Sequence, residues 1–139
     1  MNRFGVAWVA AFLALAISGS AAAHHSFALF DQKIKITLEG TVKSFVWTNP
    51  HSLIYLDVKS ADGTIDTWQL AMNSPNNLRR QGWRKDTLQA GQQVKIVINP
   101  LRDGSKGGLF LAVTLPDGTV LGDPNRSPSD GPINVPAVP

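Results

Sequence analysis

The chain of 139 residues contains no cysteine, only three histidines and a single glutamate, Glu39. The absence of cysteine excludes disulfide bonds and the thiolate sites that hold zinc or Cu(I). No Gly-x-Ser-x-Gly, phosphate-loop or His-Glu-x-x-His motif occurs, so the common signatures of hydrolases and nucleotide-binding enzymes are missing. The length suggests one small domain, which its hydrophobic core alone must stabilise.

Residues 1–23 have the pattern of a secretory signal peptide. Arg3 precedes an apolar run from Phe4 to Ile17, and the three alanines at 21–23 offer an A-x-A cleavage site. The run is shorter than the roughly 18–20 residues of a membrane-spanning helix, and no later apolar segment is long enough. We therefore expect a periplasmic protein of residues 24–139 with a net charge of +2 and no membrane span after cleavage.

The pattern of apolar residues predicts β-strands over 33–42, 52–60, 64–72, 92–100 and 109–115, with a short return at 120–121. The centre of 52–60 is apolar on both faces, which predicts a strand that is covered on both sides. Gly40 marks a bend or a bulge in the first strand. The sequence ADGT at 61–64 predicts a hairpin between the second and third strands. Ser74 and Pro75 predict the start of a short helix that ends near Gly82.

Three strands, a short helix and two further strands follow one another in the order of an OB-fold, a small Greek-key barrel. We predict a mainly β structure over residues 24–122, with about five strands and one short helix between strands 3 and 4. An open β-sandwich is the alternative, and an OB-fold does not by itself name a ligand. Residues 123–139 contain five prolines and few large apolar residues, which predicts a disordered, proline-rich tail.

The two adjacent histidines, His24 and His25, directly follow the expected cleavage site. Cleavage after Ala23 makes His24 the N-terminal residue, with a free amine beside its imidazole. The amine and the imidazole Nδ1 of His24 can then chelate one ion. His51, in the sequence TNPHS, supplies a third nitrogen in the arrangement called a histidine brace. Nitrogen ligands in a planar geometry suit Cu(II), which stands at the top of the divalent affinity order. The sequence therefore predicts a copper site at the mature N-terminus.

Residues near these histidines complete the predicted site. His25 is expected as a further ligand or as a group that supports the ligands. Trp47 is expected to stack on His51 or to face a ligand, and Asn49 lies in the same turn. Met72 offers a soft axial sulfur, and a place in the hydrophobic core is the alternative for this residue.

Cleavage one residue earlier changes the chemistry, because the terminus becomes Ala23-His24-His25 with a histidine in third place. The amine, two deprotonated amides and the His25 imidazole then form a square plane, as in the amino-terminal copper and nickel motif. Both cleavage sites predict copper binding. They differ in which histidine binds the ion and in whether His51 is needed.

A copper site of this kind predicts carriage or buffering of copper, or its delivery to another exported protein. One alternative is a metal-independent module of the cell envelope that binds a ligand or a protein through Trp47, the loop 102–108 and the basic helix. A further alternative is a copper-dependent oxidoreductase, although no catalytic residue is predicted. The basic residues of the helix are expected to form a solvated face, and the modest charge and the export signal argue against nucleic acid.

The chain resembles an uncharacterised family of small exported bacterial proteins, a domain of unknown function, over residues 23–122. The resemblance lies in AHHSF, LEGTVKSFVWTNPHS, SPNNLRRQGWRKDTLQAGQQV, PLRDGSKGG and VTLPDGTVLG. His24, His25 and His51 match the family's pattern, whereas Asn73 and Asn77 stand where the family often has glycine. The resemblance implies a periplasmic location, a compact β-rich fold and no established activity.

Overall fold

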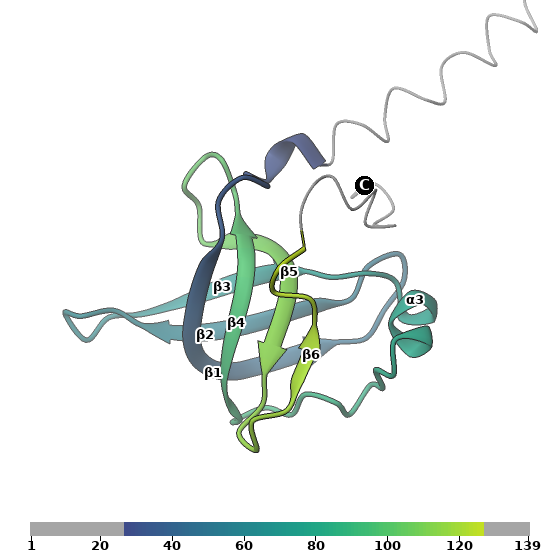
Figure 1. Cartoon of the computed structure of the whole chain (residues 1–139). Helices are drawn as coiled ribbons and strands as arrows, with labels where there is room; N and C mark the ends of the chain where they lie inside the picture. Colours follow the sequence, from purple (N-terminus) through teal and green to yellow (C-terminus); the bar gives the residue numbers. More distant parts are fainter. Residues whose placement is uncertain (1–26, 127–139) are drawn as a thin grey trace, which may run out of the picture.

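The computed structural model describes residues 27–126 (Figure 1). Its elements are the 3₁₀-helix η1 (Phe27–Leu29), β1 (Ile36–Val46), β2 (Leu53–Lys59), β3 (Ile65–Ala71), the helix α3 (Pro75–Arg80), β4 (Gln93–Pro100), β5 (Gly107–Thr114) and β6 (Val120–Gly122). The expected signal peptide, His24, His25 and most of the expected proline-rich tail lie outside the described residues. Within those residues, no helix has the length and apolar character needed to cross a membrane.

The strands form one sheet in the order β3-β2-β1-β4-β5-β6, and neighbours in this order are antiparallel. β3 also pairs in parallel with β5, from Gln69 to Ala71 against Gly107 to Leu109. This pairing joins the two sides of the sheet and closes a five-stranded barrel, with β6 added at the edge of β5. Since α3 lies between β3 and β4, the arrangement is the predicted OB-fold.

β1 is the longest strand and belongs to both halves of the barrel. Thr41 faces Asp57 of β2 on one side and Gln93 of β4 on the other, and a bulge lies between Val42 and Ser44. At Gly40 a side chain would collide with the carbonyl oxygen of Asp57, so only glycine allows this close approach. The bulge therefore lies at least two residues after Gly40, and what requires the glycine is the close approach of β2.

The start of β1 differs from the prediction, because the strand begins at Ile36 and not at Lys33. The side chain and the carbonyl of Asp31 accept hydrogen bonds from the backbone N–H groups of Lys33 and Ile34, which holds these residues in a turn. Ile34 is accordingly exposed and does not share the buried face of Leu38. Local hydrogen bonding by an aspartate thus overrides the apolar alternation here.

The core fills the barrel and extends under α3. Ile54 and Leu56 of β2 and Ile96 and Ile98 of β4 are fully buried. For β4 the alternation of apolar residues predicts this burial. Trp83 is 1% exposed, and its ring contacts Phe45 and Phe110 at centroid distances of 6.0 and 5.4 Å. These apolar contacts hold the barrel and the segment after α3 together.

The helix α3 begins and ends where the sequence predicts. Ser74 caps its start by accepting a hydrogen bond from the backbone N–H of Asn77, and Pro75 occupies the first turn. Gly82 has a positive φ of 87°, which ends the helix at little steric cost. The chain then turns inward, so that Trp83 enters the core directly after the helix.

Candidate functional site

His51 is the one histidine within the described residues, and it is almost completely buried. It lies in the turn between β1 and β2 with only 7% of its surface exposed. Its Nδ1 is 3.3 Å from the carbonyl oxygen of Met72, at the end of β3. The backbone of Ser52 donates to Asn73 and accepts from Met72, at 3.1 and 3.0 Å. The turn is therefore tied firmly to the end of β3.

This hydrogen bond determines which nitrogen of His51 carries the proton. A carbonyl oxygen can only accept, so Nδ1 donates to Met72 and the neutral imidazole keeps its lone pair on Nε2. Nε2 is buried and has no hydrogen-bond partner in residues 27–126. The oxygen Oγ of Ser52, the next residue, is also buried and unpaired there. A buried nitrogen without a hydrogen-bond partner is uncommon in a folded protein. In metal-bound histidines, the ring nitrogen that does not bind the metal typically donates to a carbonyl or carboxylate, as Nδ1 of His51 does to Met72.

His51 lines a pocket of about 580 Å³, which we call the His51 pocket. Four parts of the chain meet there, namely the segment that leads into the barrel, the β1–β2 turn with the start of β2, the end of β3, and the loop before β5 with the start of that strand. They supply Leu29, Phe30, Thr48, Asn49, Pro50, His51, Leu53, Gln69, Ala71, Leu101, Ser105, Lys106, Gly107 and Gly108. Apolar side chains make up a large share of this lining.

The N-terminal segment is fixed to the His51 pocket by backbone hydrogen bonds. The N–H of Asp31 donates to Pro100 at 2.8 Å, and the carbonyl of Leu29 accepts from Arg102 at 2.9 Å. Phe30 forms an isolated β-bridge with Leu101 and is buried. The chain therefore approaches the barrel beside the pocket that contains His51.

Two of the predicted site residues, Asn49 and Met72, lie near His51. Asn49 lines the same pocket, and Met72 contributes its backbone carbonyl, while its side chain lies in the core with 1% exposure. The Met72 side chain therefore packs in the hydrophobic core, which was the alternative predicted for it. His24 and His25 lie outside the described residues. Within those residues, no three side chains of histidine, cysteine, aspartate or glutamate are grouped so that they could hold a metal.

Trp47 lies in a second pocket, of about 530 Å³, which we call the Trp47 pocket. It is lined by Trp47, Arg79, Gly82, Trp83, Arg84, Lys85 and Asp86. The guanidinium of Arg79 lies over the Trp47 ring at 5.8 Å from its centroid. The alternative of a ligand-binding module expects Trp47, the basic helix and the loop 102–108 to act together, but the loop lines a different pocket from the other two. The basic helix shares a pocket with Trp47, and Ser105 and Lys106 of the loop line the His51 pocket.

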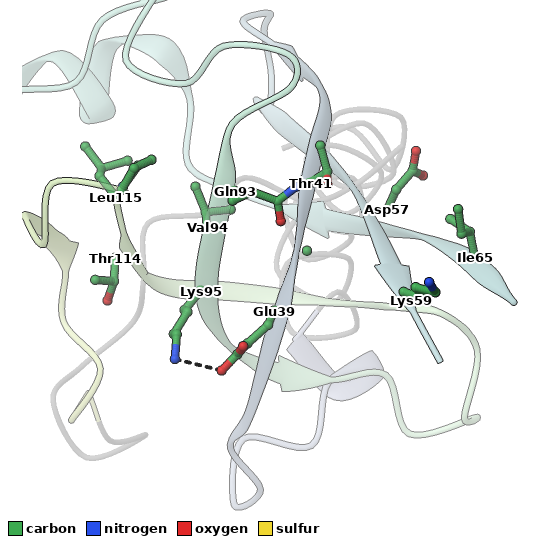
Figure 2. Close-up of a pocket in the computed structure, with 12 residues that line it drawn as sticks. Glu39, Thr41, Asp57, Lys59, Ile65, Gln93, Val94, Lys95, Thr114 and Leu115 are labelled. Atoms are coloured by element: carbon green, nitrogen blue, oxygen red, sulfur yellow. Dashed lines mark hydrogen bonds and ion pairs between the residues drawn. The ribbon is translucent and has the colours of Figure 1, made fainter. Parts of the chain in front are cut away.

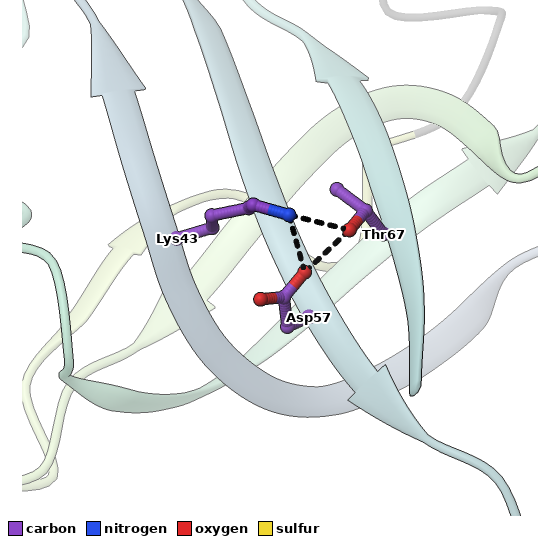
Figure 3. Close-up of polar contacts among 3 residues, drawn as sticks. All are labelled: Lys43, Asp57 and Thr67. Carbon is purple, nitrogen blue, oxygen red and sulfur yellow. Dashed lines mark hydrogen bonds and ion pairs between the residues drawn. The ribbon is translucent and has the colours of Figure 1, made fainter. Parts of the chain in front are cut away.

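The outer face of the sheet forms a groove of about 650 Å³ between β1, β4 and the ends of their neighbours (Figure 2). Glu39 and Lys95 form an ion pair of 2.8 Å across it. Figure 3 shows a second group, in which Lys43 contacts Asp57 at 3.6 Å and Thr67 at 3.1 Å, while Thr67 donates to Asp57. These exposed charges neutralise one another across the strands, and pairs of this kind stabilise a surface only slightly.

Three aspartates with lowered pKa values lie in tight turns and not in a site. The backbone N–H of Thr64 lowers the pKa of Asp62, and that of Thr119 lowers the pKa of Asp117. The Ser105 hydroxyl, followed by its N–H, lowers the pKa of Asp103. Hydrogen bonds to the charged carboxylate explain all three shifts, so they indicate turn structure and no catalytic acid.

The comparisons with known proteins bear on the fold and the family. The chain is similar to the crystal structure of the mitochondrial single-stranded DNA binding protein Rim1 from S. cerevisiae, with a TM-score of 0.46 and 11% identity. The alignment covers 63% of this chain and 94% of that chain, and a similarity of this size does not bear on ligands. No curated protein matches the sequence. Residues 12–111, which include all three histidines, match the family model of a family of unknown function (DUF6152), and the chain belongs to this family.

Proposed function

We propose that the protein is exported to the periplasm, loses residues 1–23, and binds one Cu(II) ion between its new N-terminus and His51. The observation that supports this proposal is the lone pair of His51 Nε2, which is buried and has no partner within residues 27–126, while Nδ1 is held by Met72. Leaving such a nitrogen unpaired costs about 1–3 kcal/mol, and a bound metal ion removes that cost.

The length of the chain supports a meeting of the terminus with His51. Leu29 lines the same pocket as His51, and His24 precedes Leu29 by five residues. Five residues span at most about 18 Å when fully extended. The N-terminal amine is therefore within reach of the His51 pocket.

The chemistry of the donors favours copper. The amine and Nδ1 of His24 form one chelate, and Nε2 of His51 completes a set of three nitrogens. Such a set suits Cu(II) in a planar geometry. His25 is the further ligand, or a group that supports the others. The role is carriage or buffering of copper, with an exported copper protein or an envelope component as the partner.

The experiment compares chains that differ only at the terminus. The chain starting at His24 is expected to bind one Cu(II) by isothermal titration, with nitrogen hyperfine structure in its electron paramagnetic resonance spectrum. Acetylation of the His24 amine blocks the chelate without touching the barrel and without placing a histidine third in the chain, and should weaken binding by at least about a hundredfold. His51→Ala should weaken binding as well. Unchanged binding in both variants would show that no histidine brace forms.

His25→Ala separates the two possible cleavage sites. In a chain that begins at His24, this substitution should leave most of the copper affinity in place. In a chain that begins at Ala23, His25 would be the third residue and its loss should abolish binding, while His51→Ala should have no effect. The mass of the protein recovered from the periplasm identifies which terminus the cell produces, and recovery of an uncleaved chain would contradict the proposed export and processing.

A further inference from the structure

The Trp47 pocket has a rigid aromatic wall. The ring of Trp47 meets Phe45 edge to face at a centroid distance of 5.6 Å, and Phe45 in turn contacts Trp83 at 6.0 Å. Trp83 is buried and continues the row to Phe110. A row of rings from the core therefore fixes the half-buried indole of Trp47, whose remaining surface lines the pocket. Its volume of about 530 Å³ is within the range of small-molecule sites.

Three cationic side chains, those of Arg79, Arg84 and Lys85, line the pocket beside this wall, and none of them is paired with a carboxylate in the described part of the chain. Among the described residues of the lining, Asp86 alone is acidic, so they carry an excess of two positive charges. Arg79 contacts the Trp47 ring instead of an acid. An anion that enters the pocket would thus meet donors that are already gathered.

Trp68 provides an internal comparison on another part of the barrel. Lys106 lies over its ring at 5.4 Å from the centroid, as Arg79 lies over Trp47. Lys106, however, forms an ion pair with Asp66 at 3.2 Å. The cation at Trp68 is therefore neutralised within the protein, whereas the cations at Trp47 are not.

We propose that the Trp47 pocket binds an acidic sugar, such as one uronic acid unit of a polysaccharide. The C–H groups on one face of a pyranose ring pack against the electron-rich face of an indole. The carboxylate of the same unit then pairs with the guanidinium groups of Arg79 and Arg84, whose planar donors match a carboxylate in two places. A neutral sugar would leave the three cations unused.

The single accessible ring distinguishes this site from a site for single-stranded nucleic acid. Such sites stack successive bases on several exposed aromatic side chains along a basic groove. Here Trp47 is the one ring that lines the pocket with accessible surface, since Trp83 is 1% exposed. The choice of a polysaccharide as the source of the acid also rests on the export proposed above, whereas the anion chemistry does not depend on copper.

The experiment titrates trigalacturonate into the metal-free chain 24–139 and follows the indole N–H signals by nuclear magnetic resonance. The Trp47 signal is expected to move with a saturable dependence on ligand concentration, while the Trp68 signal stays in place. Maltotriose, a neutral sugar of the same length, should move neither signal. Higher salt should weaken the binding of trigalacturonate. Equal shifts with maltotriose would overturn the requirement for an acid.

Charge variants complete the test. Arg79→Gln and Arg84→Gln should each weaken binding about tenfold, since each removes one charge-assisted contact. Lys59→Gln is the matched control, because it removes the same charge from an exposed residue in the groove of Figure 2 and should leave binding unchanged. An equal loss in the control would mean that only net charge matters, which contradicts a built site. Tighter binding of a thymidine oligonucleotide at the same Trp47 signal would also overturn the proposal.

Discussion

Replacing His51 with phenylalanine tests whether its Nε2 is held ready for a ligand. The substitution removes the 3.3 Å hydrogen bond from Nδ1 to Met72, worth about 1 kcal/mol, and leaves that carbonyl less well paired. It also removes a buried nitrogen that has no partner in the described residues, whose burial costs about 1–3 kcal/mol. These effects oppose each other, so the free energy of unfolding of the metal-free protein should change by less than about 1.5 kcal/mol.

Copper should separate the wild type from His51→Phe. A ligand that binds only the folded state adds about 2.7 kcal/mol of stability at a concentration one hundred times its dissociation constant. The wild type should gain this amount with Cu(II), whereas the variant should gain little. The measurement is urea unfolding of both proteins, starting at His24, in EDTA and in excess copper, followed by tryptophan fluorescence.

Two results would refute the reasoning about His51. A loss of more than about 3 kcal/mol in EDTA would mean that both imidazole nitrogens are satisfied in the metal-free protein, so that His51 has a structural role. An equal stabilisation of both proteins by copper would mean that the ion binds without His51. The first result tests whether Nε2 is unpaired in the metal-free protein, and the second tests whether His51 is a copper ligand. Either idea can therefore be refuted without the other.

Three further predictions concern the barrel. Gly40→Ala should lower the free energy of unfolding by about 1–3 kcal/mol in urea, because the new methyl group meets the carbonyl of Asp57, and an unchanged value would mean that β1 can shift. Ser74→Ala should cost about 0.5–1 kcal/mol in the same assay, since its capping bond is long at 3.4 Å, and a cost above about 2 kcal/mol would contradict a weak cap. The Thr119 N–H holds the pKa of Asp117 below its ordinary value of 3.8, so its contribution is present above that value and is lost as pH falls through the lower folded pKa. Asp117→Asn should therefore show a smaller fall in Tm than the wild type between about pH 5 and pH 3, and an equal fall would assign the acid sensitivity to other groups.

The fold could be predicted because its signals are local. The alternation of Val94, Ile96 and Ile98 places one face of β4 in the core, and Ser74 with Pro75 fixes the start of α3. The order of these elements then leaves few topologies, of which the OB-fold is one. The start of β1 could not be predicted from alternation, because a turn formed by Asp31 competes with the strand.

The candidate site could be predicted only in part, since its contacts join distant parts of the chain. His51 stands out in the sequence because histidine is rare in this chain. Its hydrogen-bond partner is the backbone carbonyl of Met72, 21 residues away. Because every residue type has such a carbonyl, no sequence pattern indicates this partner. The meeting of Leu29 with the β1–β2 turn depends on closure of the barrel and leaves no pattern in either segment. Trp47 is close to His51 in the sequence, yet the turn between them places the two side chains in different pockets.

The position of the N-terminal segment makes the cleavage site decisive for the chemistry of copper. Because Leu29 is fixed beside the pocket of His51, a terminus at His24 can offer its amine to the ion that we propose His51 binds. A terminus at Ala23 puts four nitrogens around the ion on its own, and His51 then adds nothing. Nε2, buried and without a partner within residues 27–126, would bind the ion only in the first case. The two termini are therefore distinguished by His51→Ala, which should lower the copper affinity only of a chain that begins at His24.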